Sequence, residues 1–383
     1  MTLSEILSNE ELRRHEFPVA RERIFLAHAG VCPLPRRVAE AVRTYAGRCT
    51  LGDQETLLPA HQLQKSRELA VRLLNAHAEE IAFVGPTSLA LSFVSAGLPF
   101  TRNDNILVYF EDYPANVYPW MTLAEKGVEV RFLKVRELGR IQAADVEEQV
   151  DENTRLVALA SCHFVAGYRI DLQAIGELLR ERKILFSVDA IQSLGAFPTS
   201  VEHVDFLAAD AHKWLLGPCA AGIFFVRKGL QERLKPVACG WNNVRCPNYI
   251  AQETLAFRPD ARRYEAGTHN LLGLVGLNAA LELLLEIGID NIASELLRKR
   301  AWLAPALQEK GYVVLQPDAT PSSASGILSF HRPGANLAAL HQKLEEARIT
   351  VSLRADRSGQ RYIRLSPHFY NTDAELHRLL EFL

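Results

Sequence analysis

The sequence lacks a dominant charge of either sign. Its 383 residues include 43 Lys and Arg against 45 Asp and Glu, which gives a formal net charge of −2. A chain so balanced has no general attraction for nucleic acid or for an anionic membrane surface, so any anion must be bound locally. No uncharged apolar run approaches the length of a membrane span. We therefore expect neither nucleic acid nor a membrane as a partner.

Motifs for metals, disulfides and secretion are also missing. The six cysteines are scattered, and no two of them form the C-x-x-C pair typical of zinc sites and redox centres. Residues 1–17 are charged and lack the apolar core of a signal peptide. These absences predict no metal and no disulfide framework, and they favour a location in the reducing cytoplasm.

Short apolar runs alternate with helical patterns through the first two thirds of the chain. Helical periodicity is clearest at residues 64–76 and 172–182. This alternation is typical of a mostly parallel sheet flanked by helices, so we predict an α/β fold. The predicted strands are residues 81–84, 105–110, 128–133, 155–160, 184–188, 205–208 and 222–226.

The last hundred residues follow a different order. A long helical stretch with a break near Gly288 comes first, and a final helix opens with the capping-box pattern Thr372-Asp-Ala-Glu375. Between them we predict strands at 326–330, 349–353 and 361–365 and a helix at 337–346. This order predicts a smaller α+β domain. We divide the chain into an N-terminal segment packing with the small domain (1–24), a large domain (25–285) and a small C-terminal domain (286–383).

Asp189 and Lys213 suggest the chemistry. Asp189 ends a predicted buried strand, where open α/β sheets bind ligands, although an isolated Asp there also fits a helix cap. Lys213 has Ala, His, Trp and Leu neighbours, and a shielded lysine becomes a competent amine nucleophile. Pyridoxal 5′-phosphate (PLP) needs a lysine to hold its aldehyde carbon as a Schiff base and an acid near its pyridine nitrogen. The pair therefore predicts a PLP site.

The phosphate of that cofactor needs a cradle. Thr87 and Ser88 follow Gly85-Pro86 and precede a helical run. Backbone N–H groups at a helix N-terminus, together with two hydroxyls, can bind phosphate, although the same residues also fit a plain cap. His212 and Gln192 are natural further contacts.

Together these residues resemble the class V aminotransferase family of PLP enzymes, fold type I. The family includes cysteine desulfurases, selenocysteine lyases, kynureninases and isopenicillin N epimerase-like proteins. The resemblance runs from Phe25 to Thr372 and is strongest in SVDAIQSLGAFP (187–198) and ADAHKWLLGP (209–218). It implies the fold type I architecture, with Lys213 as the Schiff-base lysine and acid/base and Asp189 on the pyridine nitrogen.

The resemblance implies roles for further residues. Gln192 would lie near the phenolic oxygen of the cofactor, and Thr87, Ser88 and His212 would bind its phosphate. Tyr113, in the segment 111–120, would stack on the pyridine ring, and Asn116 of the same segment is a candidate for substrate binding.

Two later segments complete the implied site. Arg364 would hold the substrate carboxylate in a bidentate pair, which fits a small amino-acid substrate. Thr268 would reach the phosphate of a partner subunit, which implies a homodimer with shared active sites. Arg354 and Arg361 are expected to be surface charges.

The chain departs from the family at several positions. Residues 351–360 contain no cysteine, whereas desulfurases carry their sulfur-accepting thiol there. Ala166 stands where many relatives have a polar residue, so His163 either replaces that cofactor contact or only fills a buried polar pocket. His28 either contacts substrate or is structural, and His269 replaces the usual proline.

We predict a PLP enzyme that acts at the α-carbon of a small amino acid. Transamination is favoured because the desulfurase cysteine is missing. The alternatives are a C–S or C–Se lyase that does not need this cysteine, an epimerase of the same family, and a PLP-binding protein without turnover. A nucleotide-phosphate site near Gly85 ranks below these because neither GxGxxG nor GxxxxGK[ST] occurs there.

Overall fold

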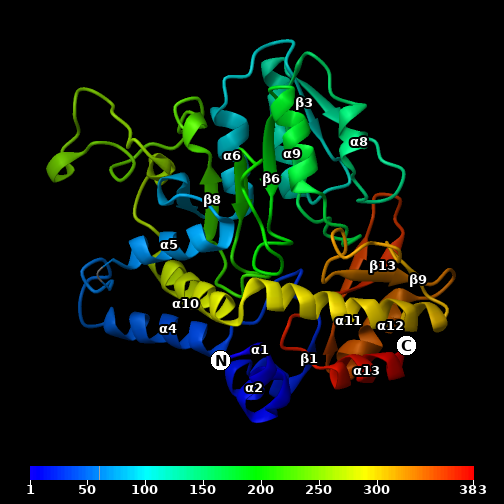
Figure 1. Ribbon diagram of the computed structural model, residues 1–383. Coiled ribbons are helices and arrows are strands. Elements are labelled where there is room, and N and C mark those ends of the chain that lie inside the picture. The colour runs from blue at the N-terminus through cyan, green and yellow to red at the C-terminus, as the bar shows by residue number, and fades with distance from the viewer. Residues whose placement is uncertain (60) are drawn as a thin grey trace.

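The computed structural model describes residues 1–59 and 61–383. Within them a seven-stranded sheet of order β2-β8-β7-β6-β5-β3-β4 forms the centre of the large domain (Figure 1). Six of these strands run in the same direction, and β8 runs opposite to them. The predicted α/β fold is confirmed. Two predicted strands, 81–84 and 222–226, match the observed bounds, and the others differ at their ends by one or two residues. The strands are β2 (Ile81–Val84), β3 (Asn105–Val108), β4 (Glu129–Phe132), β5 (Thr154–Ala160), β6 (Leu185–Asp189), β7 (Phe206–Ala209) and β8 (Gly222–Val226).

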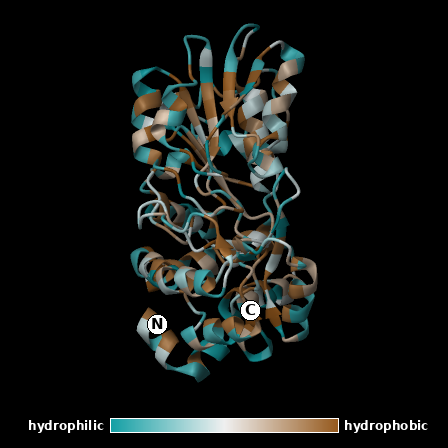
Figure 2. Cartoon of the chain, turned by 90° about the vertical axis from the view of Figure 1, so that its right-hand side faces the viewer, coloured by the Kyte–Doolittle hydropathy of each residue, from teal (hydrophilic) through white to brown (hydrophobic). Residues whose placement is uncertain are grey.

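Both faces of this sheet are buried. Successive residues of a strand point to opposite faces, and in β2 Ile81 and Phe83 join one apolar core while Ala82 and Val84 join another. Helix α6 (Thr87–Gly97) covers the second core, whereas α5 (Gln62–Leu74) and α9 (Leu172–Glu181) cover the first. Figure 2 shows the apolar strands between helices with hydrophilic outer faces. The helices on both faces of the sheet hold the ends of the strands in fixed positions.

The small domain follows two consecutive helices. α10 (Leu271–Ile287) and α11 (Ile289–Glu309) meet at Gly288, with a bend of 74°. Gly288 has φ +88°, which a residue with a side chain rarely adopts, so glycine permits the break there. The predicted final helix is present, with the Thr372–Glu375 capping box intact.

The small domain contains a four-stranded antiparallel sheet of order β12-β13-β10-β9. Its two-residue strand β9, like β1, is too short for a periodic pattern, and neither was predicted. The remaining elements are α1 (Leu3–Ser8), α2 (Glu10–Glu16), α3 (Val19–Glu22), β1 (Ile24–Phe25), α4 (Arg36–Arg48), α7 (Tyr118–Met121), α8 (Ala143–Glu147), β9 (Val313–Val314), β10 (Leu328–His331), α12 (Leu337–Glu346), β11 (Ile349–Thr350), β12 (Ser352–Ala355), β13 (Arg361–Leu365) and α13 (Asp373–Phe382).

The N-terminal segment contacts elements from both ends of the chain. Arg13 is buried and forms a 2.8 Å ion pair with Glu375 of α13, and Phe17 stacks on Tyr370 with ring centroids 4.0 Å apart. Strand β1 pairs in parallel with β11. The amino group of Met1 pairs with Glu286 of α10. The segment thus packs against the small domain and also reaches α10, and the exact domain boundaries stay a prediction.

No single helix in the described residues is long and apolar enough to cross a membrane. The pair α10 and α11 passes that test only when the two bent helices are taken together. Most of α10 is buried against α4, α5 and the sheet core, so its apolar composition is explained by packing.

Candidate functional site

The site lies at the carboxyl ends of the parallel strands. Asp189 is the last residue of β6, and Lys213 follows β7 by four residues. Thr87 follows β2, whose carboxyl end lies at the same edge because β8 runs antiparallel to both β2 and β7. A cavity of about 310 Å³ opens there. The predicted residues that line it together are Thr87, Ser88, Tyr113, Asp189, Gln192, His212, Lys213 and Arg364.

Lys213 is a buried amine in this cavity. Its side chain keeps little exposure, and its Nζ lies 5.2 Å from the centroid of the Tyr113 ring. Burial lowers the pKa of Lys213 to about 8; Asp189 acts in the opposite direction, while Arg364 acts in the same direction as burial. A larger share of the amine is therefore neutral near neutral pH, as a nucleophile requires.

Asp189 shares the strand edge with a second buried carboxylate, Asp112. Burial, followed by the charge of Asp112, raises the pKa of Asp189 to about 7. Asp112 accepts hydrogen bonds from the N–H groups of Tyr113 (2.7 Å) and Ala160 (3.1 Å). Ala160 is the register neighbour of Asp189 in β5 and β6. Asp112 therefore anchors the Tyr113 loop to the sheet directly beside Asp189.

We expect Asp189→Asn to stabilise the cofactor-free protein at pH 8 but not at pH 4. A carboxyl whose folded pKa lies above its unfolded value favours the protonated folded state, so the unfolding free energy falls as pH rises from about 4 to 8. A tenfold difference in proton affinity between the folded and unfolded states corresponds to about 1.4 kcal/mol, so a gain of a few kcal/mol at pH 8 is expected. Urea unfolding at both pH values measures it. An equal gain at both values would contradict the raised pKa.

Thr87 and His212 are both oriented by Asp210. The backbone N–H of Asp210 donates to Thr87 Oγ1 (2.9 Å), and its Oδ2 lies 2.8 Å from His212 Nδ1. Its carboxylate also accepts the N–H groups of Ala220 and Ala221. Since Thr87 and Ser88 begin the eleven-residue helix α6, the hydroxyls and the free N–H groups of its first turn lie at the cavity.

Gln192 connects the cavity floor to the N-terminal loop. Its Nε2 donates to the carbonyl of Ala29 (3.1 Å), and its Oε1 accepts the indole N–H of Trp214 (3.0 Å). Both ends of this amide are thereby fixed, and the amide orientation follows from its two partners.

Two arginines, Arg354 and Arg364, also line the cavity around Lys213. Arg364 is almost fully buried on β13, donates to the carbonyl of Phe164 (2.7 Å) and has no hydrogen-bond partner for its Nε. Burial, and then the charge of Arg354, lowers the pKa of Arg364 to about 9. A Cβ on Gly30 would lie 3.9 Å from an Nη of each arginine. Both guanidinium groups therefore lie close to Gly30, and two neighbouring positive charges are suited to binding an anion.

Arg354 has a position that the sequence does not indicate. The sequence predicts a surface charge, and the side chain is exposed, but it also lines the cavity beside Arg364. The antiparallel pairing of β12 with β13 sets Ser352 opposite Arg364, so Arg354, two residues further along β12, lies on the same face of the pair. No local pattern in the sequence indicates that pairing. The sequence also does not single out Asp112 and Asp210, because an acidic residue after a strand usually caps a helix or turn.

Two histidines predicted for the site lie outside the lining of this cavity. His28 is completely buried, with Nδ1 2.9 Å from the Ser366 carbonyl and Nε2 2.7 Å from the Tyr370 hydroxyl. His163 accepts the Ala166 N–H at Nδ1 (2.9 Å), so the proton lies on Nε2, which donates to the Glu111 carbonyl (2.9 Å). Burial lowers the pKa of each imidazole to about 4. Both fit the structural alternative, as buried neutral rings with both nitrogens paired.

Asn116 and Thr268 also lie apart from Lys213. Asn116 is buried, donates to Asp112 (3.0 Å) and accepts the indole N–H of Trp120 (3.1 Å). Thr268 is exposed and lines a separate cavity of about 290 Å³ with Gly85 and Leu89. Within one chain, neither residue joins the lining around Lys213.

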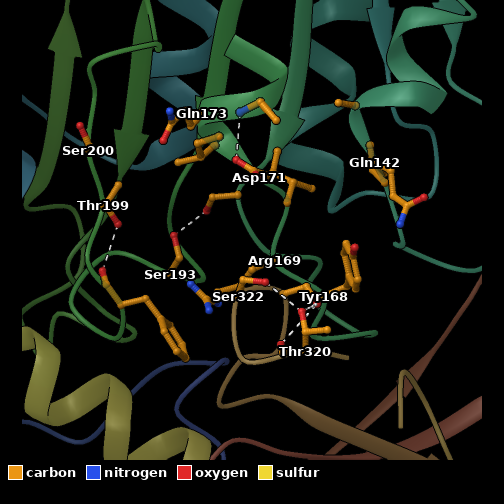
Figure 3. A pocket seen from close by; sticks show the side chains of 18 of the residues that line it. Gln142, Tyr168, Arg169, Asp171, Gln173, Ser193, Thr199, Ser200, Thr320 and Ser322 are labelled. Carbon is orange, nitrogen blue, oxygen red and sulfur yellow. Dashed lines mark hydrogen bonds between the residues drawn. The ribbon is translucent and has the colours of Figure 1, made fainter. Parts of the chain in front are cut away.

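A larger cavity of about 610 Å³ lies elsewhere, between the start of α9 and the loop 318–323 (Figure 3). Its polar groups largely bond to one another. Arg169 donates to the carbonyls of Ala324 and Pro321, Thr199 donates to that of Phe197, and Asp171 caps α9. The polar side chains of this cavity are therefore largely occupied by hydrogen bonds within the protein. We assign the chemistry to the smaller cavity because it holds the buried amine of Lys213.

Comparisons with known proteins cover almost the whole chain. A family model described as Aminotransferase class-V matches residues 24–379. The chain is 29% identical to a probable cysteine desulfurase of Methanothermobacter thermautotrophicus, with 98% of each chain covered. It is 27% identical to the uncharacterized aminotransferase YcbU of Bacillus subtilis, with 97% of this chain and 96% of the relative covered.

Solved structures share the fold. The apo cysteine desulfurase of Thermococcus onnurineus superposes with a TM-score of 0.88 at 23% identity, over 97% of this chain and 96% of that one. The cystine C–S lyase C-DES, solved with its product cysteine persulfide, gives a TM-score of 0.87 at 22% identity, over 95% and 98%. A lysine-to-alanine mutant of C-DES has been solved with glycine covalently linked to the PLP cofactor.

Proposed function

The chain belongs to the class V aminotransferase family, and on that basis we propose that it is a carbon–sulfur lyase acting on a sulfur-containing amino acid. It is a PLP-dependent enzyme with an amino-acid substrate, as its family is. The sequence alone favours transamination. The names of the relatives favour the lyase alternative instead.

The residues around the cavity fit PLP. Lys213 is a shielded amine with a lowered pKa, and Asp189 is a buried carboxyl on the same edge. The ring of Tyr113 lines the same cavity as the N-terminus of α6. These are an amine for the aldehyde, an acid for the pyridine nitrogen, an aromatic face and an anion cradle.

When bound, PLP acts as an electron sink for the bond broken at the substrate α-carbon. Asp189 would stay ionised once it faces a cation, because an opposite charge lowers a carboxyl pKa. Arg364 and Arg354 would hold the substrate carboxylate. Lys213 would take the proton from the α-carbon and return a proton to the product, since its pKa is close to working pH.

The relatives named for carbon–sulfur chemistry support a lyase over an aminotransferase, and the position of the cysteines is the observation that favours elimination over sulfur transfer to the protein. Among the described residues, none of the six lines the Lys213 cavity. Cys32 and Cys162 are buried, and burial raises the pKa of their thiols to about 12 and about 11. Such thiols stay protonated and are poor sulfur acceptors. We therefore favour direct elimination from the substrate over sulfur transfer to the protein.

We further propose that the working enzyme is a homodimer. Thr268 lines its own cavity and not that of Lys213, so its expected contact with phosphate requires a second copy. Sedimentation of the purified protein would show the dimer directly.

Product analysis tests the lyase proposal. With cystine and water, elimination gives cysteine persulfide, pyruvate and ammonia, and we expect one pyruvate for each ammonia without any keto-acid acceptor. Formation of alanine with sulfur bound to the protein would indicate a desulfurase. Turnover only with an added keto acid would indicate an aminotransferase. The variant with Cys219→Ser and Cys239→Ser, which removes both exposed thiols, should retain the pyruvate yield.

A further inference from the structure

A second cavity, of about 420 Å³, adjoins the one that holds Lys213. It lies between the loop that follows β3 and the turn that joins β12 to β13. Its volume is within the range of small-molecule sites. Six apolar side chains form much of its lining: Phe110, Val117, Tyr118, Met121, Leu138 and Val165.

Phe164 lies between the two cavities and lines both. Its carbonyl accepts the 2.7 Å hydrogen bond from Arg364, and its ring meets Tyr113 edge-on at a centroid distance of 5.4 Å. A substrate held by Arg364 and reacting beside Lys213 therefore has Phe164 as a wall. The apolar cavity begins on the other side of that ring.

Several polar groups around the second cavity are already bonded within the protein. Asp112 accepts two backbone N–H groups and the Asn116 amide, and both ring nitrogens of His163 are paired. Asp356 accepts from the Ser358 N–H (2.9 Å) and the Tyr362 hydroxyl (2.8 Å).

Two of the apolar side chains, in contrast, are open to a ligand. Tyr118 is 64% exposed and Met121 is 39% exposed. The guanidinium of Arg357 lies 3.7 Å from the centroid of Phe110, so even this charged side chain contributes a flat surface over an aromatic ring. Apart from the guanidinium of Arg357 and the partly buried side chain of Glu111, the surface available to a ligand is therefore largely apolar.

We propose that this cavity receives the substituent on the substrate sulfur, so that the preferred substrates are cysteine S-conjugates carrying a bulky apolar group. The inference rests on the proposed lyase function. The carboxylate is held at Arg364, the reacting carbons lie beside Lys213, and the substituent passes Phe164. Lys213 takes the proton from the α-carbon, the Cβ–S bond breaks, and the sulfur leaves with its electron pair and takes up a proton to become a thiol. Water then hydrolyses the remaining three-carbon unit to pyruvate and ammonia. One conjugate and one water give one thiol, one pyruvate and one ammonia, without any oxidant.

Two conjugates with alkyl thiol leaving groups test the proposal in the holoenzyme. We expect kcat/KM for S-benzyl-cysteine to exceed that for S-methyl-cysteine by about 10-fold or more, because each carbon buried in an apolar pocket adds discrimination. Met121→Glu places a charge in the lining and should lower this ratio about 10-fold. Val313→Glu, at a half-exposed site on β9, is the matched control and should preserve the ratio.

Binding is measured separately from turnover. The α-methyl analogue of S-benzyl-cysteine has no α-hydrogen to lose, so titration of the visible absorption of the holoenzyme gives its Kd. Met121→Glu should weaken this Kd about 10-fold relative to Val313→Glu.

The outcomes separate the two proposals. If both conjugates are cleaved at a ratio that Met121→Glu leaves unchanged, the cavity assignment is wrong and the lyase stands. If cystine is cleaved but neither conjugate is, the cavity assignment is again wrong. If no sulfur compound yields pyruvate, the lyase proposal fails, and an unchanged Kd in Met121→Glu would then overturn the cavity assignment independently.

Discussion

Lys213→Ala is expected to abolish covalent attachment of PLP and to lower turnover by about 10³-fold or more. The side chain supplies both the amine that holds the cofactor and the group that moves the α-proton, and acid–base catalysis alone is worth about 10²–10⁴-fold. Burial lowers the pKa of this amine to about 8, which suits both tasks. Borohydride reduction followed by peptide mapping should find the pyridoxyl group on Lys213 in the wild-type protein and on no peptide of the variant.

A second buried lysine provides the control for this prediction. Lys299 is fully buried, pairs with Glu295 (2.6 Å) and donates to the Phe369 carbonyl (3.0 Å), outside the cavity lining. Lys299→Met removes an equally buried amine and should keep the reducible cofactor link in whatever fraction of the protein folds. Recovery of the pyridoxyl group on Lys299, or its persistence in Lys213→Ala, would refute the assignment.

Arg364→Ala is expected to lower kcat/KM by about 10²–10³-fold. Losing one member of a buried, hydrogen-bonded charge pair costs about 3–4 kcal/mol, and each factor of ten corresponds to about 1.4 kcal/mol. Arg354 remains beside it, which limits the loss. Arg364→Lys keeps the charge but not the planar fork, so an intermediate effect is expected.

The carboxylate itself can be tested by comparing cystine with cystamine, which has the same disulfide without carboxylates. The wild-type enzyme should strongly prefer cystine, and Arg364→Ala should lose most of that preference. Arg361→Ala, three residues earlier on the same strand and exposed, should keep it. Equal loss of activity toward both compounds would point to a structural role for Arg364 in supporting Phe164.

The sequence predicts the sheet well because its strands are buried on both faces and their apolar runs are continuous. Asp189 and Lys213 can likewise be predicted from the sequence, since each follows such an apolar run. The sequence does not predict the roles of Arg354, Asp112 and Asp210, because these roles depend on which loops meet at the edge of the sheet. His28 and Asn116 are predicted for the site but do not line the cavity. Their side chains instead form hydrogen bonds within the protein, with Tyr370 and Trp120 respectively.

The pairing of β1 with β11 has a consequence for biosynthesis. Ile24 lies next to Ile349 in that pair, and the loop that follows β1 brings Gly30 against Arg364. The side of the cavity that holds the two arginines thus joins residues 24–30 to residues 349–364. Contacts this distant in sequence form late in folding. A nascent chain on the ribosome can build the central sheet from residues 81–226, but it cannot complete the cavity around Lys213 until Arg364 has left the ribosome.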